Sequence, residues 1–214
     1  MRGLLLKDIY MQKQYLKQYV VTLLFFSVFA VILKSPSYLT FMGLVLGLTQ
    51  MFTVISIDES GGFTYCLTLP VSRRKIVQEK YLLFLIELIV IFAATSVIGG
   101  IIAAAANIPV GEWMPQVLGA GCFYLLVISV VVPVALKWKV EKARILMLGM
   151  ILIPVMLIIL GSKLMSQQKW SGFFSPIVNT LSGGIFYAAA ALVLVVIVSI
   201  SYLISVQIFL KKEF

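Results

Sequence analysis

Long, continuous apolar segments dominate this sequence, and each is close to the roughly twenty residues that an α-helix needs to cross a bilayer. Hydrophobic residues make up 62% of the 214 residues and charged residues only 12%, whereas a soluble domain carries about 25% charged residues. The segments do not alternate with a period of two, as the strands of a membrane barrel do. Because a lipid-exposed backbone must satisfy its own hydrogen bonds, the sequence predicts an all-α polytopic membrane protein.

The apolar segments predict six transmembrane helices within a single domain that covers residues 1–214. The expected spans are residues 19–33, 39–57, 81–105, 116–136, 145–160 and 181–210. Residues 161–180, between the last two spans, are too numerous for a turn and too apolar for a free loop. A re-entrant segment in the outer leaflet and an ordinary external loop both fit this stretch.

Residues 1–18 have the pattern of an imperfect amphipathic helix. Asp8 and Gln12 interrupt the apolar half of its helical wheel. The other residues of that half are Leu4, Leu5, Ile9, Met11, Tyr15 and Leu16, and the opposite half holds Lys7, Lys13, Gln14 and Lys17. This pattern predicts an interfacial helix that lies along the membrane surface before the first span. A positively charged flank of that span is the simpler alternative.

The distribution of Lys and Arg predicts the orientation of the chain. With six spans, and both termini on the same side, only Lys34, Lys163 and Lys169 of the 17 basic residues fall on the opposite side. Basic residues collect on the cytoplasmic side of membrane proteins, so both termini are expected in the cytoplasm. The formal net charge of +9 therefore requires no nucleic acid partner.

Catalysis by this chain alone is not expected. The sequence has no His and only two Cys, Cys66 and Cys122, so it offers neither a Cys/His metal cluster nor a disulfide framework. It also lacks the G-x-x-x-x-G-K-[ST] pattern that binds the phosphates of ATP. We therefore expect no metal and no cofactor in this chain.

The longest polar interruption, residues 58–80, is the expected contact surface for another protein. Its apolar part is Leu67, Leu69, Pro70 and Val71, and its rim is formed by charges. Ser72 is placed to cap a helix that begins at Arg73. The basic rim residues are Arg73, Arg74 and Lys75, followed by Ile76. A purely topogenic role, in which basic residues keep the loop inside and attract anionic lipid, is the alternative.

Two acids and one intramembrane charge need a separate explanation. Asp58 and Glu59 follow the second span, at a helix C-terminus, where the helix dipole disfavours anions. Glu87 lies about two turns into the third span among apolar neighbours. Its expected environment is the bundle interior, water or a subunit contact, unless it reaches the membrane interface.

Two stretches of the sequence resemble a known family. They are GLLLKDIYMQKQYLK (residues 3–17) and DESGGFTYCLTLPVSRRKIVQEKYL (residues 58–82). They are similar to small bacterial type-two ABC exporter permeases, including the subunits of phenol-soluble-modulin exporters. The specific part is the run L-P-[VI]-S-R-[RK]-x-[IV], here Leu69 to Ile76, with an acidic pair before it and K-Y-L after it.

The resemblance implies an elbow helix before six spans and a cytosolic coupling helix between spans two and three. It implies a dimer of permeases in the bacterial plasma membrane, with an ABC ATPase subunit that binds ATP and Mg²⁺ and docks on the coupling helix. The implied substrates are amphipathic or antimicrobial peptides, or another hydrophobic molecule. Two other functions remain open here: an ion-coupled secondary carrier that uses Glu87, and a non-transporting membrane sensor.

Overall fold

All regular elements of the described residues are helical, which confirms the predicted all-α class. The computed structural model describes residues 2–68, 71–138, 140–164 and 184–211. The elements are α1 (Arg2–Ile32), α2 (Ser37–Ile57), the π-helical turn η1 (Asp58–Gly62), α3 (Phe63–Thr68), α4 (Arg73–Ala105), α5 (Val110–Lys137), α6 (Val140–Leu164) and α8 (Gly184–Lys211).

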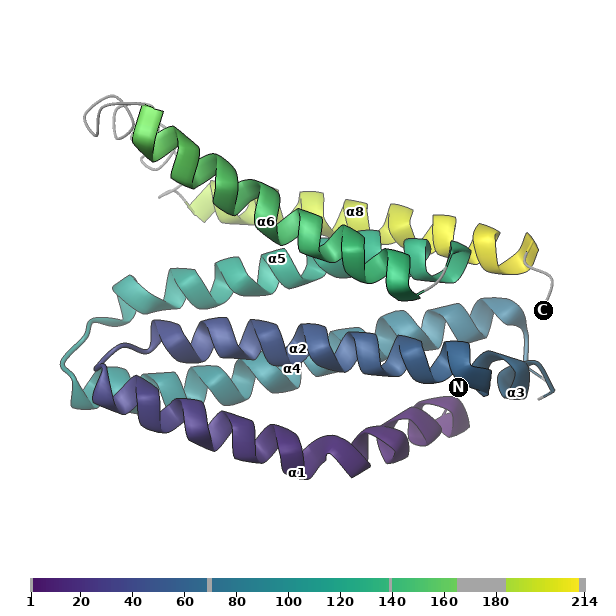
Figure 1. Cartoon of the computed structure of the whole chain (residues 1–214), viewed down its shortest axis with the longest axis horizontal. Coiled ribbons are helices and arrows are strands. Elements are labelled where there is room, and N and C mark those ends of the chain that lie inside the picture. The colour runs from purple at the N-terminus through teal and green to yellow at the C-terminus, as the bar shows by residue number, and fades with distance from the viewer. Residues whose placement is uncertain (1, 69–70, 139, 165–183, 212–214) are drawn as a thin grey trace.

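The long helices form a bundle in which α4 and α5 are central (Figure 1). Helix α4 packs against α1, α2, α5 and α8, and helix α5 packs against α2, α4, α6 and α8. Helices α1 and α6 lie at opposite sides of the bundle in this view. The start of α1 and the end of α8 lie at the same end of the bundle, together with α3.

Within the part of the chain that the structure describes, five helical stretches are long and apolar enough to cross a membrane, which makes this a multi-pass membrane protein. They are Gly3–Ile32, Ser37–Gly62, Arg73–Ala105, Trp113–Lys137 and Ala191–Lys211. Helix α6 is a further 25-residue helix, and the membrane crossing by α6, with the total of six spans, stays a prediction. Most of the outer segment 161–180 lies outside the described residues.

The surface of the bundle is apolar, as a lipid environment demands. Large aliphatic side chains such as Ile32, Ile101 and Ile145 are 66–69% exposed. In water this surface would be unstable, because roughly 25 cal/mol is lost for each Å² of apolar area left in contact with solvent. Several polar and charged side chains of the described residues are buried inside the bundle, among them Asp8, Lys80 and Glu87.

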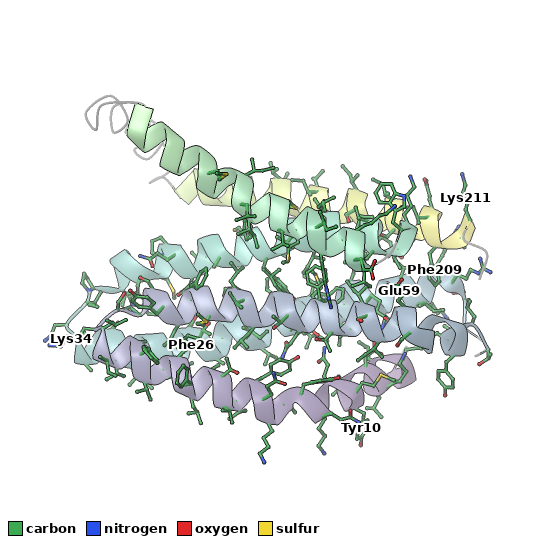
Figure 2. All side chains as sticks on the ribbon, viewed as in Figure 1. Tyr10, Phe26, Lys34, Glu59, Phe209 and Lys211 are labelled. Atoms are coloured by element: carbon green, nitrogen blue, oxygen red, sulfur yellow. The ribbon has the colours of Figure 1, made fainter. Side chains whose placement is uncertain are left out.

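The N-terminal region differs from the expected separate interfacial helix. Helix α1 runs without interruption from Arg2 to Ile32, and Figure 1 shows it as one bent helix. The two residues that interrupt the apolar half of the expected wheel do not share one environment with the rest of it. Ile9 and Leu16 are exposed, whereas Leu4 and the interrupting Asp8 are buried. Tyr10 points away from the bundle (Figure 2).

Candidate functional site

The polar stretch after α2 is folded into two short helical elements. Helix α2 continues directly into the turn η1, and α3 follows η1. Helix α4 then begins at Arg73. Gly61 has a φ of 137° and a ψ of −10°, a conformation that costs a residue with a Cβ atom free energy. At Gly61 the chain therefore makes a kink between two helical stretches, and η1 is not a regular π-helix.

A buried charge cluster holds this turn in place. We use this name for Lys7, Asp8, Asp58, Glu79 and Lys80. The Lys80 ammonium group pairs with the carboxylate of Asp8 on α1, and its Nζ atom lies 2.6 Å from Oδ2 of Asp58 on η1. Lys80 is 5% exposed, and both of these acids are 3% exposed or less. One buried lysine therefore joins α4 to two other elements.

Lys7 and Glu79 complete the charge cluster. The Nζ atom of Lys7 lies 3.2 Å from Oδ1 of Asp8 and 3.7 Å from Oδ1 of Asp58. Glu79 Oε2 lies 3.6 Å from Lys80 Nζ. Buried charges are tolerated when they are paired, so two ammonium groups and three carboxylates provide mutual compensation. Among the described residues, no acid or cysteine group has the arrangement of a metal site.

The structure explains why two acids follow the end of α2. We expected both at the rim of a contact surface, and for Asp58 this is wrong because it is 2% exposed. Glu59 is exposed, and its Oε2 atom accepts a hydrogen bond of 2.9 Å from the backbone N–H of Val140. Val140 begins α6, so Glu59 lies at a helix N-terminus, where the dipole favours an anion.

The expected coupling helix, Leu69 to Ile76, is placed in part. Leu69 and Pro70 lie outside the described residues, and Val71 and Ser72 precede α4. Ser72 occupies the N-cap position, as expected, but its side chain makes no capping hydrogen bond.

The basic residues of the same segment occupy the first turn of α4. Arg74 and Lys75 are exposed and Ile76 is buried. Arg73 donates a hydrogen bond of 3.1 Å from Nη1 to the backbone oxygen of Leu210, near the end of α8. Arg73 therefore links the start of α4 to the end of α8. Arg74 and Lys75 take no part in this hydrogen bond.

Glu87 faces the bundle interior, one of its expected environments. It is 5% exposed and accepts hydrogen bonds from the amide of Gln12 on α1 and from the hydroxyl of Tyr124 on α5, the latter at 3.4 Å. The Tyr124 hydroxyl also lies 3.4 Å from the backbone oxygen of Gly47 on α2. Helices α1, α4 and α5 therefore meet at one buried carboxyl group, and Tyr124 links α2 to it.

Sequence reasoning missed Lys80, Asp8 and Gln12 as functional candidates. One signal was present: Asp8 and Gln12 are four residues apart, so they lie on one face of a helix. That face is the one turned toward the bundle, and each residue meets a charged partner on α4.

Residues 3–210 of the chain match the model of the family described as ABC-2 family transporter protein. The chain belongs to the ABC-2 transporter family. A comparison with curated proteins finds no match. An ABC-2 transporter chain of this kind is the non-catalytic membrane permease component, and membership of the family implies an ATPase partner subunit. A partner of an ABC-2 permease in the aqueous phase can reach only an end of the bundle. The surface at the α2–α4 connection lies at such an end and is therefore a candidate contact surface.

Proposed function

We propose that this ABC-2 permease is an exporter subunit whose ATPase partner docks on residues 58–80. The partner binds and hydrolyses ATP with Mg²⁺, and the permease forms the pathway in the bacterial plasma membrane. Both termini and the docking segment are on the cytoplasmic side. The strongest support is the position of Lys80, which ties the start of α4 to α1 and to η1.

The proposed docking surface combines exposed basic side chains with an exposed tyrosine and an exposed threonine. Arg74 and Lys75 in the first turn of α4 are exposed, and so are Tyr65 and Thr68 of α3. Charged groups at the rim of an interface steer association and set its specificity, which suits a contact that must form repeatedly. Arg73 is less exposed because it contacts the end of α8.

The proposed movement passes from this surface into the membrane through α4. Helix α4 is continuous over 33 residues, so it is about 50 Å long at 1.5 Å per residue. A force on its first turn reaches Lys80 within two turns. Through the charge cluster, the same displacement pulls on the N-terminal part of α1 and on the end of α2. Closure of the ATPase would therefore move three helices together.

The substrate class and the dimer are inferred from the resemblance of residues 58–82 to small exporter permeases. We propose amphipathic or antimicrobial peptides, or another hydrophobic substrate, as cargo. A second copy of this chain, or a related permease, completes the transporter.

Copurification with the ATPase tests the proposed docking. The tagged chain is extracted from its native membrane, and retained proteins and ATPase activity are measured. We expect an ATP-binding subunit to copurify with the wild-type chain and to be lost from the double variant Arg74→Glu/Lys75→Glu. The matched control is Lys13→Glu/Lys17→Glu, which reverses two exposed charges on α1 and should retain the subunit. Equal retention by both variants, with normal transport, would exclude this docking surface.

A further inference from the structure

A pocket outside the charge cluster opens at the end of the bundle where α5 and α8 terminate. It has a volume of about 390 Å³ and is lined by Lys137 of α5 and by Ile204, Gln207, Ile208 and Lys211 of α8. None of these five residues is acidic. Figure 2 shows Lys211 at this end of the bundle, opposite the end that holds Lys34.

The lining changes from apolar to cationic along α8. Ile204 and Ile208 are one turn apart, and Lys211 follows in the next turn, so the gradient extends over about 10 Å. Ile204 is 46% exposed, and Lys137, Gln207 and Lys211 are exposed as well. An amphipathic ligand with an anionic end matches this order of groups.

The neighbouring tryptophan indicates the depth of the pocket in the membrane. The Trp138 ring lies 4.9 Å from Nζ of Lys137 and 5.9 Å from Nζ of Lys142. Tryptophan collects at the level of the lipid headgroups, so Lys137 is placed at headgroup depth. Basic pockets between membrane helices on the cytoplasmic side bind anionic headgroups.

The helix dipole offers a simpler reason for a lysine in the last turn of a helix. It explains Lys137 and Lys211 one at a time. It does not explain why two helices bring their lysines to one pocket that an amide donor and two aliphatic side chains also line. Convergence of these groups indicates a ligand rather than a local effect on each helix.

We propose that this pocket binds the phosphate headgroup of an anionic phospholipid. The ammonium groups of Lys137 and Lys211 contact the phosphate, and the Gln207 amide donates an additional hydrogen bond. Ile204 and Ile208 contact the first methylene groups of an acyl chain. Lysine is a regular binder of phosphate as a compact positive charge.

Lipid titration of the full-length chain tests the site. The chain is purified in detergent, stripped of lipid and titrated with phosphatidylglycerol or phosphatidylcholine, and the retained lipids are counted by native mass spectrometry. We expect the wild type to prefer phosphatidylglycerol. Each lysine near a headgroup contributes about fivefold to the binding of an anionic lipid, so Lys137→Gln/Lys211→Gln should weaken phosphatidylglycerol about 25-fold. The effect on phosphatidylcholine, whose phosphate is neutralised by its choline group, should be much smaller.

Two further variants separate the site from general charge and from misfolding. Lys13→Gln/Lys17→Gln removes the same charge elsewhere and should retain the preference. Gln207→Lys adds a cation to the pocket and should tighten phosphatidylglycerol about fivefold. An unchanged preference in Lys137→Gln/Lys211→Gln, or no effect of Gln207→Lys, would overturn the proposal. Displacement of phosphatidylglycerol by inorganic phosphate at equal concentration would assign the site to free phosphate and overturn the lipid assignment.

Discussion

Lys80 Nζ lies 2.6 Å from Asp58 Oδ2, which joins the start of α4 to the turn that ends α2. The two residues are at opposite ends of the polar stretch that the sequence places between two spans. Because the same ammonium group also pairs with Asp8 on α1, three helices are fixed relative to one another at this end of the bundle. The following predictions test this contact and three others.

Replacing Lys80 with Met should strongly destabilise the fold. The substitution removes the closer of the two ammonium groups that Asp8 and Asp58 share and leaves them only Lys7, and breaking a buried ion pair in this way costs about 3–5 kcal/mol. Thermal unfolding of the detergent-solubilised chain measures the loss. Lys75→Met is the matched control, since Lys75 is exposed and should change stability little. Equal melting temperatures for the two variants would mean that the charge cluster is not a structural tie.

Glu87 should act as an acceptor of hydrogen bonds rather than as a carrier of protons. Glu87→Gln retains one oxygen, which accepts from the Gln12 amide, and its NH2 group can donate to the Tyr124 hydroxyl, which then donates to the Gly47 carbonyl. This variant should transport at close to the wild-type rate. Glu87→Leu leaves the Gln12 amide without this acceptor and leaves Tyr124 with the Gly47 carbonyl alone, so it should lower stability by about 1–3 kcal/mol. Transport by vesicles and thermal unfolding are measured for both variants. A folded Glu87→Gln variant without transport would instead favour an ion-coupled mechanism.

A hydrogen-bonded chain centred on Tyr81 should stabilise the contact of α4, α5 and α8. Ser201 Oγ donates to the backbone oxygen of Ser129 at 2.6 Å. Because that uses its one proton, Tyr81 donates to Ser201 at 2.6 Å and accepts from Ser205 at 2.9 Å. Tyr81→Phe should therefore lower stability by about 1–3 kcal/mol.

The control for this substitution is Tyr65→Phe on α3, because Tyr65 is 57% exposed. Thermal unfolding of both variants under the same conditions gives the comparison. A melting temperature for Tyr81→Phe that equals that of Tyr65→Phe would contradict the proposed stabilisation.

A methyl group at Gly47 should disturb the packing of α2 against α5. A Cβ atom there would lie 2.8 Å from Cε2 of Tyr124, a side chain that is fully buried. Gly47→Ala is expected to cost about 1–3 kcal/mol because the ring must move. Gly121→Ala on α5 is the control, since a Cβ atom there meets nothing within 4 Å. If the control destabilises the chain as much as Gly47→Ala does, steric contact with Tyr124 is not the cause.

The sequence predicted the positions of the long helices well. It did not predict which polar side chains contact one another. Each expected span lies largely on a long helix, and the helix expected from Arg73 begins at that residue. The functions of the polar residues could not be predicted from the sequence. Asp8 and Gln12 only interrupt the apolar half of the expected helix there, and their partners lie on α4, far away along the chain. For the same reason Asp58 was expected at a surface although it is buried.

The sequence by itself determined the class of this protein, because long apolar runs admit only helices in a bilayer and because basic residues mark one side. The run from Leu69 to Ile76, which resembles exporter permeases, pointed to residues 58–80 as the expected contact surface for a partner. Only the tertiary structure decided which charges are paired. Lys80 meets Asp8 across 72 positions of sequence, and the free energy of a buried charge depends on its neighbours in space rather than along the chain.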